Sequence, residues 1–353
     1  MTRLAAPHAG IAAALGAALL FGVGTPLSKL LLAGTDPWLL AGLLYAGSGL
    51  GLTLWRLLRP TAARARLAPG DGRWLAGAVL AGGVVGPVLL MWGLANMPAS
   101  AAALLLNAES VFTAVIAWVV FRENVDRRIF IGMVAIVAGA VVLSWPDRGG
   151  VAIGSLLPPL AVLGACLAWG IDNNLTRKVA LADATLIASI KGLVAGATNL
   201  ALALVLGAAW PSIATTGGAL AVGLLAYGVS LVLFVVALRH LGAARTGAWF
   251  GVAPFFGALV AVVGLGDAVT LPLLAAGALM AIGVWLHASE RHAHEHVHEP
   301  LAHEHEHRHD DHHQHAHAPG TAPGEPHTHA HRHAPLRHEH AHFPDAHHRH
   351  GHG

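Results

Sequence analysis

Long apolar runs separated by short polar breaks fill the first 288 residues of the chain. Each run is close to 20 residues long and apolar throughout, without the alternation that marks a membrane-spanning strand. The lipid core offers no partners to backbone polar groups, so such a run must form a helix, which satisfies them internally. The pattern predicts ten helices, at residues 10–32, 37–57, 74–95, 99–121, 128–145, 153–174, 184–208, 217–239, 244–265 and 268–288.

The composition agrees with a membrane protein. Of the 353 residues, 55% are hydrophobic and 11% are charged, whereas a soluble domain carries roughly 25% charged residues. The breaks hold turn-forming sequences such as Pro69-Gly70-Asp71-Gly72. The single cysteine, Cys166, lies inside an apolar run, so no internal disulfide forms and we interpret it as a packing residue. The first run is too long for the core of a cleaved signal peptide, and we expect it to be retained.

Arginine and lysine gather at every second break, and the alternate breaks are almost free of them, with Arg148 as the exception. Because positively charged loops stay in the cytoplasm, we predict that both termini lie on the cytoplasmic side of a bacterial inner membrane. Basic residues at helix ends indicate a lipid bilayer as partner and exclude nucleic acid. The clusters are Arg56, Arg59, Arg64, Arg66 and Arg73; Arg122, Arg127 and Arg128; Arg177 and Lys178; and Arg239 and Arg245.

An internal repeat relates the two halves of the apolar region. With five helices each, the halves must enter the bilayer in opposite directions, and each is charged where its own orientation requires. Inverted five-helix repeats are an architecture of secondary transporters, whose substrate site lies between the repeats near the bilayer midplane. A shift of 144 residues places the fourth and fifth predicted helices on the ninth and tenth, with Ala99 on Ala243, Phe112 on Phe256, Gly139 on Gly283 and Glu123 on Asp267.

Several short motifs stand out within the predicted helices. They are Phe21-Gly22-Val23-Gly24-Thr25-Pro26-Leu27-Ser28-Lys29, Asn173-Asn174-Leu175-Thr176-Arg177, Phe121-Arg122-Glu123 with Gly132 and Gly139, and Ala253-Pro254-Phe255-Phe256 with Asp267 and Gly283. With these motifs the chain resembles the EamA-like transporters of the drug/metabolite transporter (DMT) superfamily, over roughly residues 8–288. Ser110 stands where that family often has proline, opposite Pro254, so we expect the fourth helix to be straighter than the ninth.

The resemblance implies an all-α polytopic membrane protein with two inverted five-helix repeats, at residues 8–146 and 152–289, before a tail at 290–353. It also implies secondary transport, most often export of small organic solutes, without ATP and without a required cofactor. The absence of a Walker-type phosphate loop from the sequence agrees with this expectation. The sequence leaves open whether the chain acts alone or as a homodimer.

Charged and amide side chains inside a span are costly and usually face a cavity or a partner. Glu109, beside Asn107 near the middle of the fourth helix, is the best candidate for a carboxylate that exchanges protons or recognises a cation. Lys191, about two turns into the seventh helix, either pairs with such a carboxylate or binds an anionic substrate. Lys29, near the outer end of the first helix, either joins the site or extends its ammonium to the membrane surface.

Other side chains are weaker candidates. Asp172, Asn173 and Asn174 lie near the cytoplasmic end of the sixth helix, where they line a vestibule or cap the helix. Tyr227 and Trp249 either line a cavity or serve as packing and interface anchors. The sequence holds no nucleophile beside a base, so we do not expect an enzyme.

The tail differs abruptly in composition. All but three of the 26 histidines lie between His292 and His352, and no apolar periodicity accompanies them, so we expect disorder. Neutral imidazole suits Ni²⁺, Zn²⁺, Co²⁺ and Cu²⁺, which predicts labile binding of a divalent metal. The candidate ligands in His-x-His spacing are His292, His294, His296, His298, His303, His305, His307 and His309.

Three functions remain open at this point. The first is transport of an organic solute, with the tail as a metal-binding extension. The second is export of a divalent transition metal that the tail collects. The third is a membrane-bound metal sensor or scaffold without transport. Metal-transporting spans usually carry several ligands, and here only Glu109 qualifies clearly, so the sequence favours the organic solute.

Overall fold

The computed structural model describes residues 5–58, 67–68, 70–121, 127–145, 153–179, 183–241, 246 and 249–288, together with four strands between 293 and 341. Among these residues, eight helices are long and apolar enough to cross a membrane by length and composition. Two shorter apolar helices, Ala253–Leu265 and Leu271–His287, follow them. The part of the chain predicted to be membrane-embedded is therefore mostly helical among the residues that the structure describes.

The helices of the first half are α1 (Ala5–Leu31), α2 (Pro37–Leu58), α3 (Asp71–Ala78), α4 (Gly86–Ala95), α5 (Ala99–Leu105), α6 (Ala108–Phe121) and α7 (Arg127–Ser144). A 3-10 turn, η1 (Leu32–Gly34), extends α1, and a π-helical segment, η2 (Val79–Val85), joins α3 to α4.

The second half holds α8 (Ile153–Thr176), α9 (Ala184–Val205), α10 (Ile213–Val222), α11 (Ser230–Leu241), α13 (Ala253–Leu265) and α14 (Leu271–Ala288). The 3-10 turn η3 (Arg177–Val179) extends α8, and a second π-helical segment, η4 (Gly223–Val229), joins α10 to α11.

The two halves repeat the same irregularities at the same offset. The segments η2 and η4 differ by 144 residues at both ends, and so do α7 and α14. Within η2 the amide of Gly86 donates to Ala81, and within η4 the amide of Ser230 donates to Leu225, each a bond spanning five residues. Such i→i−5 bonds define a π-helix, which is rare and often found at functional sites.

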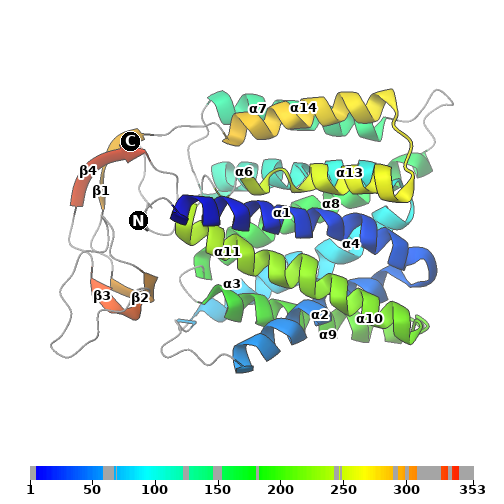
Figure 1. Ribbon diagram of the computed structural model, residues 1–353, viewed down its shortest axis with the longest axis horizontal. Coiled ribbons are helices and arrows are strands. Elements are labelled where there is room, and N and C mark those ends of the chain that lie inside the picture. Colours follow the sequence, from blue (N-terminus) through cyan, green and yellow to red (C-terminus); the bar gives the residue numbers. More distant parts are fainter. Residues whose placement is uncertain are drawn as a thin grey trace.

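The helices of each half pack against helices of the other half in a matching way. Helix α1 packs against α11 and α13, and α8 packs against α4 and α6; likewise α2 contacts η4 and α9 contacts η2. Helices α2 and α9 pack on each other, as do α7 and α14, which lie together along one edge of the bundle (Figure 1). At the α2–α9 crossing, a Cβ at Gly49 or Gly192 would overlap the facing backbone. Small residues thus let these two helices approach closely.

The ninth predicted helix has a turn at Gly251 and Val252, before α13, and the fourth has a turn at Leu106 and Asn107, which divides it into α5 and α6. The backbone amides of both residues bond only three residues back, to Ala103 and Leu104. The side-chain amide of Asn107 also donates to the Leu104 carbonyl at 2.9 Å. Side-chain competition for backbone groups therefore breaks this helix without a proline.

After the helices, the described part of the tail consists of four strands, β1 (Ala293–His298), β2 (Ala302–His307), β3 (His327–Arg332) and β4 (Leu336–Ala341). Strand β1 pairs with β4 and β2 pairs with β3, both antiparallel. The His-x-His spacing itself has a period of two, which matches the alternation of side chains along a strand.

A candidate solute site around helix α8

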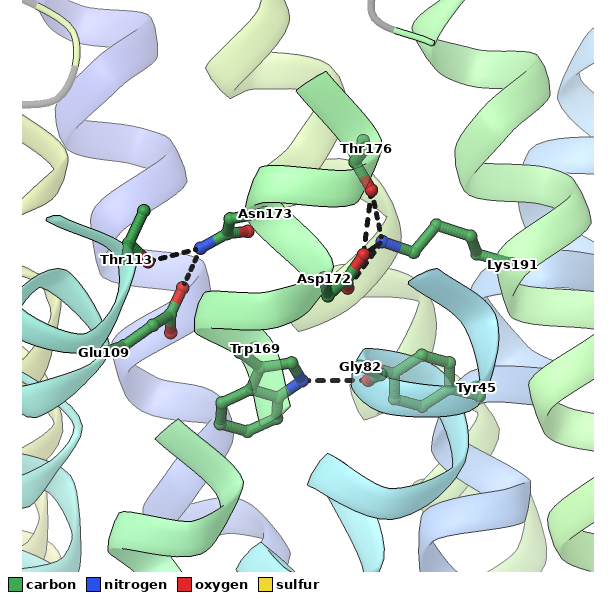
Figure 2. A network of polar contacts seen from close by, with 9 residues as sticks. All are labelled: Tyr45, Gly82, Glu109, Thr113, Trp169, Asp172, Asn173, Thr176 and Lys191. Atoms are coloured by element: carbon green, nitrogen blue, oxygen red, sulfur yellow. Dashed lines mark hydrogen bonds and ion pairs between the residues drawn. The ribbon is translucent and has the colours of Figure 1, made fainter. Parts of the chain in front are cut away.

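The polar side chains of the helical region gather around the last two turns of α8, between Trp169 and Thr176 (Figure 2). Helix α8 contacts α6, α4 and η2, so its side chains reach elements of the other half. Consecutive helical residues point about 100° apart, since a turn holds 3.6 residues. The neighbours Asp172 and Asn173 therefore face different partners, and two polar groups form on different faces of one helix.

On one face, Asp172 and Lys191 form a closed ion pair between α8 and α9. The Lys191 ammonium lies 2.6 Å from each carboxylate oxygen of Asp172. The hydroxyl of Thr176 donates to the same carboxylate at 2.8 Å. The carboxylate of Asp172 also fills the space beside Gly82, where any Cβ would overlap it. Of the two roles predicted for Lys191, the geometry corresponds to the pairing with a carboxylate, although the carboxylate is Asp172.

On the other face, Glu109 stands in the first turn of α6, directly after the turn that separates α5 from α6. The side-chain amide of Asn173 donates to its Oε1 at 2.8 Å and lies 3.3 Å from the hydroxyl oxygen of Thr113. Asn174 donates to the Thr113 carbonyl at 3.1 Å. Amides of α8 thus hold the start of α6, and Glu109 makes no ion pair within the part of the chain that the structure describes.

The π-helical segment η2 contributes backbone acceptors beside this cluster. Because the Gly86 amide bonds to Ala81, the Gly82 carbonyl loses its regular helical donor. The Tyr45 hydroxyl and the Trp169 indole replace it, at 2.8 Å and 2.9 Å. The sequence alone does not single out Tyr45 or Trp169, since aromatic residues in apolar runs are usually packing residues.

The next carbonyl, that of Gly83, also lacks its helical donor, and here the reason can be read from the sequence. Pro87 has no amide hydrogen, so the Gly83 carbonyl four residues earlier cannot receive a helical bond. The fully buried Asn199 of α9 donates its side-chain amide to that carbonyl at 2.9 Å. Side chains from α2, α8 and α9 therefore fasten η2 at its freed carbonyls. A proline four residues after a glycine, facing a helix with a buried asparagine, is the signal that could have indicated this contact.

Aromatic rings extend from the polar cluster toward α1 and α11. The ring of Tyr45 lies 5.5 Å from that of Tyr227, which lies 5.9 Å from Phe21. Phe21 in turn lies 5.5 Å from Phe250, and Phe250 lies 4.9 Å from Phe234. The sequence candidate Tyr227 thus lies between Tyr45 and Phe21 in a row of rings contributed by both halves.

The remaining candidates lie apart from the cluster. The Lys29 ammonium donates to the carbonyls of Leu94, Ala95 and Met97, at 2.6 to 3.1 Å, and so caps the C-terminal end of α4. Trp249 is 40% exposed, and none of the ring contacts among the described residues includes it. Cys166 is fully buried, and its thiol donates weakly to the Leu105 carbonyl at 3.6 Å.

Metal ligands are sparse in the helical region. Among the residues that were described, no group of three or more His, Cys, Asp or Glu side chains could hold a metal ion. Of the eight predicted tail ligands, His292 and His309 lie outside the described residues, and the other six lie in β1 and β2. Of the two described carboxylates beside α8, Asp172 is ion-paired with Lys191, whereas Glu109 has the side-chain amide of Asn173 as its hydrogen-bond partner.

Known proteins resemble this chain in sequence and in fold. Residues 8–145 match the EamA-like transporter family. An uncharacterized transporter of Methanothermobacter thermautotrophicus is 28% identical over 289 residues, which cover 76% of this chain and 83% of that protein. A solved crystal structure has a TM-score of 0.59 and 18% sequence identity, and the match covers 81% of this chain and 96% of that one.

Proposed function

We propose that this chain, whose residues 8–145 match the EamA-like transporter family, exports small organic solutes that carry a positive charge, by secondary transport across a bacterial inner membrane. Glu109 is the residue that meets the solute or the coupling proton. The observation that carries this proposal is that Glu109, at the interrupted helix α5–α6, has no ion-pair partner among the described residues, while Asn173 donates to its carboxylate.

The charge balance around α8 supports a cationic solute. Lys191 is engaged by both carboxylate oxygens of Asp172, so it has little capacity left for an anionic substrate. Glu109 adds one negative charge that no described side chain neutralises. A lone carboxylate in a bilayer is costly unless it is protonated or meets a cation. Proton and solute would therefore compete for the same group, which favours exchange of one for the other.

The arrangement of the halves supports alternating access. In this proposal the two five-helix repeats are inverted, with both termini and the tail in the cytoplasm. Two observations favour equivalent halves around a common site. The π-helical segments η2 and η4 match, and α1 and α8 each pack against helices of the other half. The site between such halves lies near the midplane and is built from discontinuous helices. Glu109 follows one such interruption.

Metal export is the weaker alternative. It would need several ligands within the spans, and the described residues of the helical region offer no group of three. A sensor or scaffold that transports nothing predicts no flux with any solute. Both alternatives are excluded or supported by the same measurement.

The test is solute flux in vesicles reconstituted with purified full-length protein. Organic cations, zwitterions and anions of similar size would be compared with Zn²⁺ and Ni²⁺, with and without a pH gradient. We expect the wild type to move cations in exchange for protons, and Glu109→Gln to lose at least 90% of that flux because it can neither release a proton nor attract the solute. Ser110→Ala, one position further along α6, is the matched control and should retain flux.

Preferential transport of anions, or full cation flux by Glu109→Gln, would contradict the proposal. Flux of Zn²⁺ or Ni²⁺ that disappears with Glu109→Gln would favour metal export. Absence of flux for every probe in correctly inserted protein would favour the sensor.

A further inference from the structure

Helices α13 and α14 follow each other in the chain, yet they pack on different neighbours. Helix α13 packs on α1 and α5, whereas α14 packs on α7. The contact between α7 and α14 is tight, because a Cβ at Gly139 or Gly283 would overlap atoms of the facing helix. The bundle therefore has a seam between α13 and the α7–α14 pair, which lies along one edge (Figure 1).

A groove with a volume of about 460 Å³ occupies this seam. It is open toward the surface of the bundle, since Leu259 and Leu274 on its walls are exposed. The buried Leu104 of α5 forms its floor. The described residues that line it are leucine, valine, phenylalanine, alanine and glycine, so none of their side chains offers a polar atom. These side chains can therefore hold an apolar group and can make no hydrogen bond to it.

The groove extends along both helices over most of one leaflet. On α14 its lining runs from Leu273 to Ala281, and on α13 from Phe255 to Val262. With a rise of 1.5 Å per residue, these stretches are about 12 Å and about 10 Å long. One leaflet contributes about 15 Å to the hydrocarbon core of a bilayer. The groove thus starts near the connection at residues 266–270 and reaches toward the middle of the membrane.

We propose that this groove binds an acyl chain of a phospholipid, from the leaflet on the side of the 266–270 connection. Water does not suit the groove, because a buried water needs two to four polar partners. An empty groove would leave its walls without dispersion contacts. A helix of a second copy, about 10 Å wide and about 12 Å long, would occupy roughly 900 Å³, about twice the volume available. A single alkyl chain is thinner, flexible and present at this depth in every bilayer.

A bound chain contacts three elements at once. The α7–α14 pair meets the rest of the bundle mainly through α5, α6 and α8. An acyl chain in the groove lies against α5, α13 and α14 together and closes the seam between them. Because the groove exists only in the folded bundle, the lipid stabilises that bundle by mass action. The proposal does not rest on the transported solute or on Glu109, and it stands if the transport proposal fails.

The experiment uses full-length protein in vesicles of phosphatidylethanolamine and phosphatidylglycerol. A small fraction of the phosphatidylethanolamine carries a photoactivatable diazirine in one acyl chain, and peptide mass spectrometry after illumination locates the attached lipid. Val137 and Val141 serve as the reference, because they are exposed on α7, which packs on α14. We expect about fivefold more attachment at Leu274 and Ala278 than at these valines, which corresponds to a preference of about 1 kcal/mol.

Gly277→Leu fills the groove from within α14. A Cβ at Gly277 would lie 3.6 Å from Leu104, an ordinary contact, so a larger side chain can extend into the groove. This variant should lower attachment in the groove to the level of the α7 valines. Ala281→Leu, also on the lining, is the second variant in case Gly277→Leu fails to fold. Ala275→Leu is the matched control, since Ala275 is exposed on α14 and is not among the described lining residues, and it should keep the wild-type pattern.

Three results would overturn the proposal. Equal attachment at the groove and at the α7 valines would mean that only annular lipid surrounds the helices. Undiminished attachment in both folded filling variants would place the lipid elsewhere. Rapid disulfide cross-linking of two copies through Leu274→Cys, in Cys166→Ala protein, would assign the groove to a second copy of the chain.

Discussion

Asp172 and Lys191 carry opposite charges into a region that solvent reaches poorly. Their side chains are 7% and 19% exposed, and the ammonium contacts both carboxylate oxygens. Removing one partner of such a pair typically costs about 3–5 kcal/mol, because the other charge stays buried alone. We therefore interpret Asp172 and Lys191 as one neutral unit. In our proposal, Glu109 of α6, which contacts Asn173 on another face of α8, is the charge that remains for a solute.

The contact between Asp172 and Gly82 makes a prediction at this scale. In Gly82→Ala the new methyl group would overlap the Asp172 carboxylate, so the ion pair or η2 must shift. We expect a loss of stability of about 3 kcal/mol, at the upper end of the usual cost of overpacking. Thermal unfolding in detergent, followed by size-exclusion chromatography, measures it.

Gly217→Ala is the matched control for this substitution. Gly217 also lies in a helix, α10, but has no atom within 4 Å of the place its Cβ would take. Its replacement should be neutral or stabilising by up to about 1 kcal/mol, since alanine favours the helix. Equal melting temperatures for the two alanine variants would show that Asp172 does not fill the space beside residue 82.

Some residues of the candidate site can be recognised from the sequence, and others have a role that depends on which backbone hydrogen bonds a helix makes. Glu109 and Lys191 stand out because a charge in an apolar run needs a partner. Tyr45 and Trp169 do not, because their role depends on the Gly82 carbonyl, which is free only since the helix takes an i→i−5 bond at that place. Neither hydropathy nor composition indicates whether a helix makes i→i−4 or i→i−5 bonds at a given place.

At the scale of elements, the apolar pattern located the helices but not their interruptions. The predicted boundaries of α2 and α7 differ from the observed ones by no more than one residue at either end. The segments η2 and η4 and the turn at Leu106 and Asn107 were missed, because an interrupted helix keeps the same apolar composition as a regular one. Proline is the usual sign of a break, and the α5–α6 turn has none.

The end of α4 offers a test of what Lys29 does. Its ammonium donates to three carbonyls at the helix C-terminus, where a positive charge is also favoured by the helix dipole. Lys29→Met should lower the free energy of unfolding by about 1–2 kcal/mol and leave the solute preference unchanged. Lys29→Arg should restore most of the stability. Normal melting of Lys29→Met together with a changed solute preference would place Lys29 in the transport path instead.

At the scale of the whole molecule, the strands of the tail pair with one another, and the helices pack among themselves. The internal repeat predicted from the sequence has an offset of 144 residues, and the same offset separates η2 from η4. The pairing of the tail strands could not be foreseen from hydropathy, because no apolar residues set their register.

Removal of residues 290–353 should therefore leave folding and solute flux within about twofold of the full-length protein, and should abolish Zn²⁺ binding. Flux into reconstituted vesicles and calorimetry with Zn²⁺ measure the two effects separately. The full-length protein treated with chelator is the control for a contribution of metal alone. Loss of flux in well-folded truncated protein would mean that the tail takes part in transport.

The fit between Gly82, Asp172 and Lys191 also limits how this protein can change over generations. A side chain at position 82 is tolerated only after Asp172 has become smaller, and a smaller, uncharged residue at 172 leaves Lys191 alone in the bilayer. Lys191 would therefore have to lose its charge first, but that change would leave the buried carboxylate of Asp172 without its partner. Every order of single substitutions passes through a poorly folding ancestor, so these three positions in η2, α8 and α9 should be inherited together or replaced together.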